Sequence, residues 1–505
     1  MRPRIGIIGG GFTGASVAIH LSRKSAVPLD ILVVEPSAEL GRGVAYGSTD
    51  PDHRINGPTI QHSLYPDDGG HFDNWCRITG VFADDPECRD GAGRAFVRRA
   101  VMGRYVGHEL AVHQRDNSSG SSIRHIQDRA VNARIDGHGF MVSLAANEGL
   151  ACDLLVITTS NAPPALLPAF HGAVAGHAAF YSDPWDLPRL EEIASDARIL
   201  IVGTGLTMAD VAIAVLRERP GARITAVSRR GLLPQGQRRV PREDTIAQAM
   251  DCEVPAFVER HGTPNSVRVL LRALRGDARN RIAEGSEWQV AVDELREAAH
   301  HLWPALSIQE QSRFGRHLAP WYETYRFRYP PQTEVKVQAL IAAGRLTPRA
   351  AAIVSAQPRQ ERIEVTTRRR GQDDLTIEEF DAVINCTGPE RKPGQTGDPF
   401  LQNLVSGGLL VNHPLGLGLV VDDLFRAQNR EGRHEGRLRV IGPLSRGRLG
   451  ETNGVPHTGV HIVRVLHDIL AELDQVAAAG ASASPSISPS TTAISRARSR
   501  SDDRR

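Results

Sequence analysis

Cysteine is scarce in this sequence, and its few copies are scattered. Among the 505 residues there are five cysteines: Cys76, Cys88, Cys152, Cys252 and Cys386. No two of them form a Cys-x-x-Cys pair, and none stands at the Cys/His spacing of a zinc site. The odd number argues against a disulfide framework. We therefore expect reduced, buried thiols in a cytoplasmic protein, and no metal site.

Long apolar runs and an excess of one charge are also missing. No stretch approaches the roughly 20 apolar residues of a membrane span, and a strand predicted to begin near residue 4 leaves no room for a signal peptide. The 60 basic and 58 acidic side chains give a net charge of +2. Nothing in this balance indicates a nucleic acid or an anionic membrane as a partner. We expect neither, and no obligate protein partner is evident.

Glycine, by contrast, forms a clear pattern near the N-terminus. Residues 4–8 read as a buried strand and residues 15–21 as a helix, and the turn between them holds Gly9, Gly11 and Gly14. These glycines would allow a tight turn, the approach of a pyrophosphate and close packing of helix on strand. Glu35 ends the next apolar run, where its carboxylate can accept both ribose hydroxyls. The pattern predicts a dinucleotide site, the alternative being a glycine-rich turn of purely structural use.

The same pattern returns in the middle of the chain. A buried strand over 197–202 leads into Gly203 and Gly205, and Thr207 opens the next helix. Met208 stands at the third glycine position, which weakens this second fingerprint. The following strand ends in Arg229, where basic side chains could hold a 2′-phosphate or could simply be solvated. The sequence thus predicts a second nucleotide, NADH or NADPH, with a slight preference for NADPH.

The remaining patterns outline the domains. Residues 123–144 and 352–379 alternate with period two and predict two antiparallel meanders, and residues 243–343 show helical spacing. Strands over 381–385 and 438–441 then predict a return to the first domain, with Gly388 and Gly442 near the first nucleotide. We predict an FAD-binding domain in two parts (1–196 and 346–475), an NAD(P)H-binding lobe (197–345) with a helical insertion, and a disordered tail (476–505). The fold class is α/β, with two Rossmann-like domains.

Two stretches are candidates for substrate binding. The long polar connection over 41–58 leaves the edge of the first nucleotide pocket and contains Arg54. The end of the helical insertion is the densest cluster of aromatic and arginine residues in a chain with 5% aromatics, and it includes Trp321, Tyr322 and Arg326. Packing alone could explain the aromatics, whereas interleaved arginines are harder to bury without an anion.

Several local motifs narrow the comparison with known proteins. They are GVAY at 43–46, GTGLTM at 203–208, the run from Trp288 to Trp303, WYETYRFRYPP at 321–331 and GPLSRGRLGE at 442–451. Together with the two glycine turns they resemble the bacterial family that holds FAD-dependent urate hydroxylases and aspartate N-monooxygenases. The resemblance extends to about residue 473. It implies FAD at the first turn and reduced nicotinamide at the second.

The resemblance also implies the reaction. In such flavoproteins the flavin takes a hydride from NADH or NADPH and activates O2, so no Ser/His/Asp set or further protein acid is required. The leading prediction is hydroxylation of urate to 5-hydroxyisourate. Urate is a planar anion, and Trp321, Tyr322, Arg326 and Arg54 could stack on it and hold it. The alternatives are N-hydroxylation of an amino acid such as aspartate, and a flavin oxidoreductase that inserts no oxygen.

Overall fold

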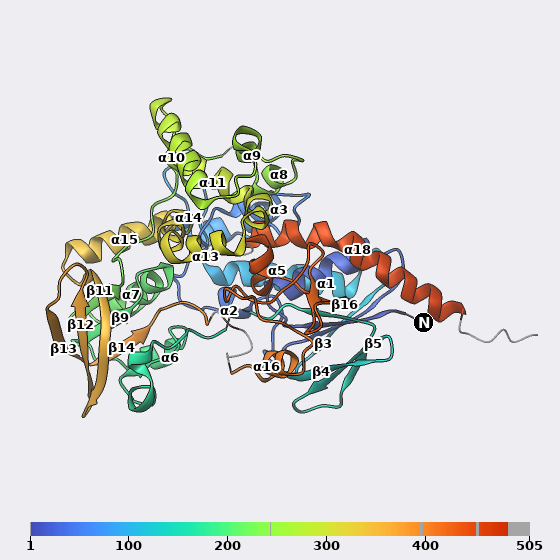
Figure 1. Ribbon diagram of the computed structural model, residues 1–505, viewed down its shortest axis with the longest axis horizontal. Coiled ribbons are helices and arrows are strands. Elements are labelled where there is room, and N and C mark those ends of the chain that lie inside the picture. The colour runs from blue at the N-terminus through green and yellow to red at the C-terminus, as the bar shows by residue number, and fades with distance from the viewer. Residues whose placement is uncertain are drawn as a thin grey trace, which may run out of the picture.

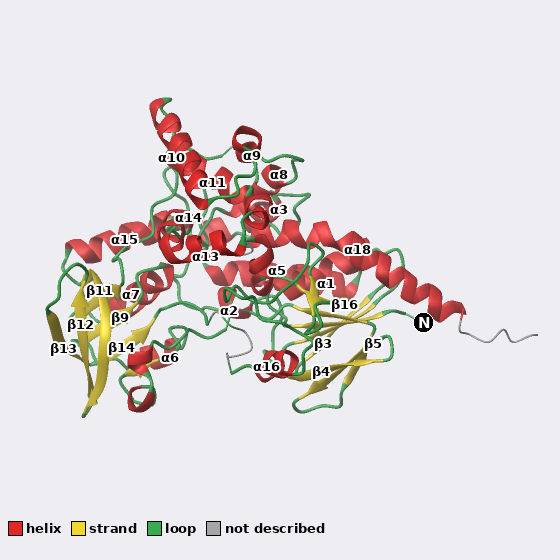
Figure 2. Cartoon of the chain, viewed as in Figure 1, coloured by secondary structure: helices red, strands yellow, loops and turns green. Residues whose placement is uncertain are grey.

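Two lobes lie side by side, and a group of helices covers one side of their junction (Figures 1 and 2). The computed structural model describes residues 2–160, 162–242, 244–390, 392, 397–450 and 454–482. Each lobe contains a largely parallel sheet, and the chain crosses from the first lobe to the second and back again.

The strands alternate with helices along most of the chain, as expected for an α/β fold. They are β1 (Arg4–Ile8), β2 (Asp30–Val34), β3 (Ser122–Ile126), β4 (Ala130–Asp136), β5 (Gly139–Leu144), β6 (Leu150–Cys152), β7 (Leu154–Ile157), β8 (Phe180–Tyr181), β9 (Arg198–Val202), β10 (Arg223–Ser228), β11 (Leu346–Arg359), β12 (Arg362–Arg369), β13 (Leu375–Phe380), β14 (Ala382–Asn385), β15 (Arg426–Gln428) and β16 (His434–Val440).

The helices range from single turns to one long C-terminal helix. They are α1 (Phe12–Lys24), α2 (Gly43–Tyr46), α3 (His71–Ile78), α4 (Val81–Asp84), α5 (Arg99–Arg115), α6 (Leu187–Leu190), α7 (Leu206–Glu218), α8 (Ile246–Met250), α9 (Ala256–His261), α10 (Val267–Ala283), α11 (Trp288–Glu297), α12 (Ala299–Ala305), α13 (Ile308–His317), α14 (Ala319–Arg326), α15 (Pro331–Ala342), α16 (Pro399–Ser406), α17 (Arg446–Leu449) and α18 (Val455–Ser482).

The first lobe is built on a sheet with the order β15-β16-β7-β1-β2-β3. Strand β1 pairs in parallel with β2 and β7, and β16 pairs in parallel with β7. The predicted strands over 4–8 and 438–441 are therefore confirmed as members of one sheet, in which β7 lies between them. Because both faces of such a sheet are covered, its strands are almost wholly apolar.

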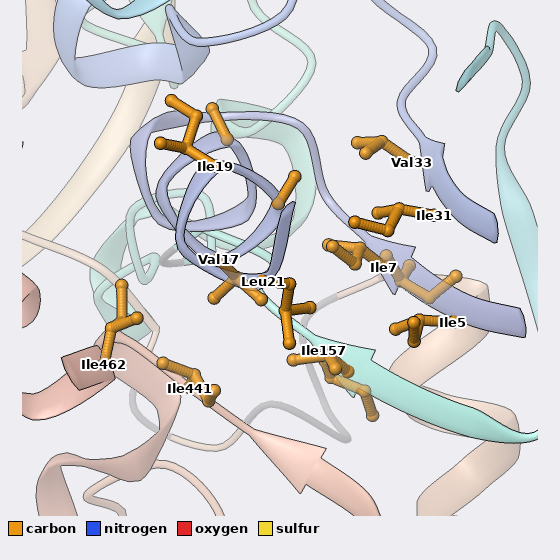
Figure 3. Close-up of a cluster of buried hydrophobic side chains, with 14 of the residues drawn as sticks. Ile5, Ile7, Val17, Ile19, Leu21, Ile31, Val33, Ile157, Ile441 and Ile462 are labelled. Carbon is orange, nitrogen blue, oxygen red and sulfur yellow. The ribbon is translucent and has the colours of Figure 1, made fainter. Parts of the chain in front are cut away.

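Helix α1 holds this sheet and the C-terminal helix together. Figure 3 shows Val17, Ile19 and Leu21 of α1 among isoleucines and valines from the strands, with Ile462 of α18 beside them. These side chains are fully buried or nearly so. Burial of a side chain of this size contributes about 1.5–3 kcal/mol, so the packing fixes where the first turn of α1 lies.

The second lobe is built on a sheet with the order β13-β12-β11-β10-β9-β14-β8. The meander predicted over 352–379 is confirmed as β11, β12 and β13, but β11 also pairs in parallel with β10. The predicted return of strand 381–385 to the first sheet is wrong. Strand β14 instead pairs in parallel with β9 and β8, so residues 346–385 extend the second sheet. An apolar run does not reveal which of two similar sheets it will join.

The first predicted meander also needs a correction. Strand β3 runs parallel to β2 at the edge of the first sheet, and only β4, β5 and β6 form the antiparallel three-stranded sheet. The turn between β4 and β5 holds Gly137 at φ +62°, as expected for a tight hairpin. The period-two alternation therefore predicted the strands correctly, but the pairing that it indicated for β3 is wrong.

The helical insertion is confirmed as α8 to α15, in which α8 contacts α18 and α15 packs against α7 of the second lobe (Figure 1). The C-terminal helix is longer than expected, since α18 continues to Ser482 and so includes part of the segment predicted to be a disordered tail. The rest of that prediction, residues 483–505, lies outside the described residues. With these changes the predicted α/β fold class with two Rossmann-like domains is confirmed.

A buried ion pair joins the two lobes. Arg99, at the start of α5 in the first lobe, lies 2.7 Å from Asp210 on α7 of the second lobe, and both side chains are largely buried. Removing one partner of a buried ion pair commonly costs 3–5 kcal/mol. The pair therefore fixes α7, and the glycine turn before it, relative to the first lobe.

Candidate functional site

In the first glycine turn, Gly9 and Gly14 are required by the fold itself, whereas Gly11 is not. Gly9 has φ +102°, and a Cβ atom at Gly14 would lie 1.9 Å from the carbonyl oxygen of Gly9. Gly11 is different, because its φ of −69° suits any residue and a Cβ there would meet only the Gly43 backbone at 3.4 Å. The glycine at position 11 keeps a space open at the N-terminus of α1, where backbone N–H groups favour a phosphate.

Glu35 lies beside this turn, as predicted. Its carboxylate accepts a hydrogen bond from the Gly10 backbone N–H at 2.8 Å and another from Ser37 N–H at 3.0 Å. A carboxylate has further acceptor sites, so Glu35 can still accept ribose hydroxyls. The segment after it turns back over the glycines, since the Gly41 N–H donates to the Gly10 carbonyl at 2.7 Å. The polar connection over 41–58, predicted to be functional, therefore begins beside the first glycine turn.

Gly442 and the start of α18 complete this edge of the first sheet. Gly442 follows β16 with φ +102°, and a Cβ there would lie 3.1 Å from Thr13 Oγ1 in the first turn of α1. Helix α18 begins at Val455, after the short helix α17. These residues fit FAD: the turn and α1 would hold the pyrophosphate, Glu35 the ribose, and Gly442 with α18 would face the rest of the molecule.

The second glycine turn repeats the first in the second lobe. Gly203 has φ +121° and packs against the Cys386 backbone, whereas Gly205 has φ −85° and a Cβ there would meet no described atom within 4 Å. Helix α7 begins directly after it, and Thr207 lies partly exposed in its first turn. Met208 is fully buried in the core of this lobe. The open space at Gly205 again fits a pyrophosphate at a helix N-terminus.

Arginines gather beyond the end of β10, next to this second turn. Arg229 lines an open pocket of about 470 Å³ together with Arg368, Arg369 and Arg370. They come from β10 and from the end of β12, which the intervening strand β11 brings near each other. In this fold the end of the second strand is where an adenosine ribose binds, and an arginine there accommodates a 2′-phosphate. The sequence identified Arg229 but not its three neighbours.

Gly388 lies on the crossing between the lobes. Pro164 and Pro389 form an isolated bridge, and the Ala165 N–H donates to the Gly388 carbonyl at 3.2 Å. The two connecting segments therefore run side by side, one leaving the first lobe and one returning to it. Since β14 belongs to the second sheet, Gly388 does not follow a strand of the first sheet, and the reason given for assigning it to FAD is wrong.

Arg54 is engaged within the protein. Its guanidinium lies 2.8 and 3.1 Å from the two carboxylate oxygens of Asp85 and donates to the Phe96 carbonyl at 2.9 Å. The side chain is 4% exposed. A bidentate pair of this kind fixes the loop on the first lobe, and we leave Arg54 out of the proposed substrate site.

The other three predicted substrate residues lie on α14 but face different surroundings. Trp321 is 40% exposed, whereas Arg326 is 6% exposed. The ring of Tyr322 meets Phe314 edge-on, with 5.7 Å between ring centroids. Burial, together with the positive charge of Arg296, lowers the pKa of the Arg326 guanidinium well below its ordinary value. Tyr322 and Arg326 thus face the interior, and Trp321 lies at the surface.

Two functional candidates escaped the sequence analysis. Arg296 on α11 donates to Nδ1 of His457 on α18 at 3.2 Å, across 161 positions of sequence. Arg326 also acts on His457 through its charge, and burial with these two cations lowers the pKa of His457 well below its ordinary value. Arg296 belonged to a motif that carried the family resemblance, but nothing in the linear sequence links it to a histidine so far away. The structure brings Arg296, Arg326 and His457 together at the start of α18.

The described residues show neither a metal centre nor a membrane-spanning helix. Within those ranges no group of three or more His, Cys, Asp and Glu side chains is placed to hold a metal ion. Among the helices that the structure describes, none combines the length and the apolar character needed to cross a membrane.

Buried histidines predict an acid-sensitive fold. Burial lowers the pKa of His20 to about 4 and that of His461 to about 3. Below pH 6.5 the unfolded chain binds protons that the folded protein excludes, so stability is complete above pH 6.5 and falls towards pH 4. We expect the free energy of unfolding, measured from the urea midpoint, to be constant from pH 8 to 7. It should fall from pH 6.5 to 5 by about 1.4 kcal/mol per pH unit for each such histidine.

The matched control for this pH dependence is His20→Gln, which removes one buried titrating group. This variant should start from a lower stability and lose less of it between pH 6.5 and 5. A midpoint that stays level or rises on acidification over this range would contradict the assignment of these histidines as buried and neutral.

Comparison with protein families supports the nucleotide sites. A family model described as FAD-NAD(P)-binding matches residues 6–162, the part of the chain that holds the first glycine turn and strands β1 to β7. This match confirms the predicted FAD and nicotinamide nucleotide as the cofactors. Among curated proteins no sequence matches the chain.

Solved structures resemble nearly the whole chain. The L-lysine 6-monooxygenase from Pseudomonas syringae has a TM-score of 0.61 at 16% identity, over 94% of this chain and 99% of that chain. The reduced form of ornithine hydroxylase from Pseudomonas aeruginosa has a TM-score of 0.60 at 15% identity, over 94% and 99%. The Kutzneria sp. 744 ornithine N-hydroxylase with reduced FAD, NADP+ and L-ornithine has a TM-score of 0.60 at 14% identity, over 94% and 100%. At these identities the likeness shows a shared fold.

Proposed function

We propose that this protein is an FAD-dependent monooxygenase that uses NADPH and O2 to hydroxylate the primary amine of a small anionic amino acid, with aspartate as the favoured substrate. The observation that carries the proposal is the likeness of the whole chain, both lobes included, to N-hydroxylating enzymes of ornithine and lysine. The proposal therefore prefers N-hydroxylation to the urate hydroxylation that the sequence favoured.

Each lobe has one glycine turn that would bind one cofactor. Gly11 and the N-terminus of α1 would hold FAD in the first lobe, and Gly205 with the N-terminus of α7 would hold NADPH in the second. FAD, when bound, would accept the hydride of NADPH and activate O2. The Arg99–Asp210 pair maintains the relative position of the two turns.

The interior arginines favour an anionic substrate. Arg296 and Arg326 lie close enough for each to depress the pKa of His457, and the charge of Arg296 also lowers that of Arg326. Positive groups crowded in a poorly solvated place are stabilised by a negative ligand. An α-carboxylate bound there would leave the substrate amine free to be hydroxylated, and the second carboxylate of aspartate would add a further attraction.

Urate hydroxylation is the second candidate, and the aromatic side chains of α14 are the observation in its favour. A planar anion would stack on a ring while arginines held its oxygens. Against this candidate, Trp321 is 40% exposed at the surface, and the solved structures named above act on ornithine or lysine according to their names. A flavin oxidoreductase that inserts no oxygen is the third reading.

A single series of assays distinguishes these three candidate functions. NADPH oxidation and O2 uptake are measured on the FAD-loaded protein with L-aspartate, urate, L-ornithine, L-lysine or no addition, with catalase present to reveal free peroxide. We expect L-aspartate to stimulate both rates and to yield a hydroxylamine. Loss of urate absorbance coupled to NADPH oxidation would favour urate, stimulation by ornithine or lysine alone would move the substrate class, and peroxide as the sole oxygen product would favour the oxidoreductase.

The arginine pocket beyond β10 predicts a preference for NADPH over NADH. Loss of one charge-assisted hydrogen bond to a 2′-phosphate costs about 1.5–3 kcal/mol, so Arg229→Ala should raise the KM for NADPH roughly 10- to 100-fold. The KM for NADH should not change, because NADH has no 2′-phosphate. Steady-state kinetics with both nucleotides checks this.

Arg223→Ala is the matched control for Arg229, since Arg223 lies exposed at the opposite end of the same strand. It should leave the KM for both nucleotides unchanged. If Arg229→Ala raised the two KM values equally, the pocket would not be the 2′-phosphate site.

A further inference from the structure

His457 is a buried polar residue that the cofactor sites do not explain. It stands in the first turn of α18 and is 1% exposed. Its Nδ1 atom faces the Arg296 guanidinium at 3.2 Å. A guanidinium only donates hydrogen bonds, so Nδ1 accepts, and the ring hydrogen of neutral His457 is on Nε2.

The Nε2 atom of His457 is buried and has no hydrogen-bond partner among the residues that the structure describes. Buried donors are nearly always satisfied in folded proteins, because an unmade hydrogen bond in a poorly solvated place costs free energy. Helix α18 adds a second local preference, since its N-terminus carries partial positive charge. Both features suit an acceptor on a bound molecule, since the described residues supply none.

The groups around His457 indicate the charge of that acceptor. The charged and titratable groups that act on it are Arg296 on α11, Arg326 on α14, Arg242 in the segment before α8, and His461 one turn further along α18. Arg242 is paired with Glu297 and Asp244 within the protein, and His461 is neutral near pH 7 because burial lowers its pKa to about 3. The charges that would act on the acceptor are therefore those of Arg296 and Arg326. A neutral acceptor would satisfy Nε2, but an anionic oxygen would also be attracted by these two arginines.

We propose that the Nε2 hydrogen of His457 donates to a carboxylate oxygen of the substrate, so that His457 determines specificity for anionic substrates beside Arg296 and Arg326. This inference rests on the proposed function, because it places the substrate of that reaction at the start of α18. Arg296 keeps His457 in the donating tautomer by occupying Nδ1. The hydrogen bond does not depend on protonation of His457 near neutral pH, so the affinity for the anion should be level from pH 6.5 to 8.

The test measures binding and does not require turnover. L-Aspartate and succinate, a dicarboxylate without the amine, are titrated into the oxidised FAD-loaded protein by calorimetry. His457→Leu removes the donor and should weaken both ligands about 10- to 100-fold, as expected for a hydrogen bond to a charged group. His457→Gln, whose amide N–H can take the place of the Nε2 hydrogen, should recover most of the affinity.

His467→Leu is the control, because His467 lies exposed further along α18, away from the proposed contact. It should bind both ligands as the wild type does. FAD content and melting temperature identify any variant that fails to fold, and His457→Met, which also lacks a hydrogen-bond donor, then serves in place of His457→Leu.

The outcomes separate this inference from the proposed function. Binding of succinate that His457→Leu weakens supports the inference even if no amine is hydroxylated, in which case only the proposed function fails. Equal affinity in wild type and His457→Leu, or no binding of either dicarboxylate to the wild type, would overturn it. A change confined to the flavin spectrum would also overturn it, since it would place the His457 contact on FAD.

Discussion

Gly11→Val is expected to fold normally and to purify without colour. The backbone of Gly11 lies in a region open to any residue, and a Cβ atom would meet only Gly43 at 3.4 Å, so the protein itself tolerates a side chain. The valine would instead occupy the space of the FAD pyrophosphate and cover the N–H groups of α1. Steric overlap and lost charge-assisted hydrogen bonds together cost roughly 3–6 kcal/mol, or about 100-fold or more in affinity.

Flavin absorbance per protein and circular dichroism check this expectation together. Gly14→Val is the contrasting variant, because a side chain at Gly14 meets the Gly9 carbonyl within the protein and should destabilise the fold itself. If Gly11→Val kept a full complement of FAD, the first glycine turn would not be the flavin site.

Gly205→Val is expected to stay yellow and to lose reduction by NADPH. A Cβ at Gly205 would meet no described atom within 4 Å, so the second lobe should fold, and the first lobe keeps its FAD. The valine would block the pyrophosphate of NADPH at the N-terminus of α7. Under nitrogen, bleaching of the flavin by NADPH should be about 100-fold slower or more at low nucleotide concentration.

Chemical reduction by dithionite is the control for this second variant, since it needs no nucleotide site and should bleach Gly205→Val and wild type alike. Loss of FAD from Gly205→Val, with retention in Gly11→Val, would mean that the two sites are reversed.

Local patterns predicted most of the elements and both nucleotide turns. A strand, a glycine turn and a helix are adjacent in sequence, so Gly9, Gly11 and Gly14 could be assigned roles before the structure was known. The pairing of strands into sheets could not be predicted in the same way. Strand β3 mixes apolar and polar residues, and β14 is largely apolar. Neither pattern determines the partner strand, which only long-range packing selects.

The substrate site was the least predictable part. Arg54 has the residue type expected for binding an anion, but Asp85 pairs with it within the protein, a relation that composition cannot reveal. The sequence gives no reason to predict a functional role for His457, since a lone histidine on a helix is usually an ordinary packed residue. Its significance comes from Arg296 and Arg326, which lie on other helices and reach it only through the fold.

In the proposed reaction, one oxygen atom passes from O2 to a substrate nitrogen. The most direct measurement is mass spectrometry of the product formed from L-aspartate, NADPH and 18O2 by the FAD-loaded protein. We predict N-hydroxyaspartate that carries one 18O atom, in proportion to the NADPH consumed. Unlabelled aspartate recovered with labelled hydrogen peroxide, and no hydroxylated product from any amine tested, would contradict the account.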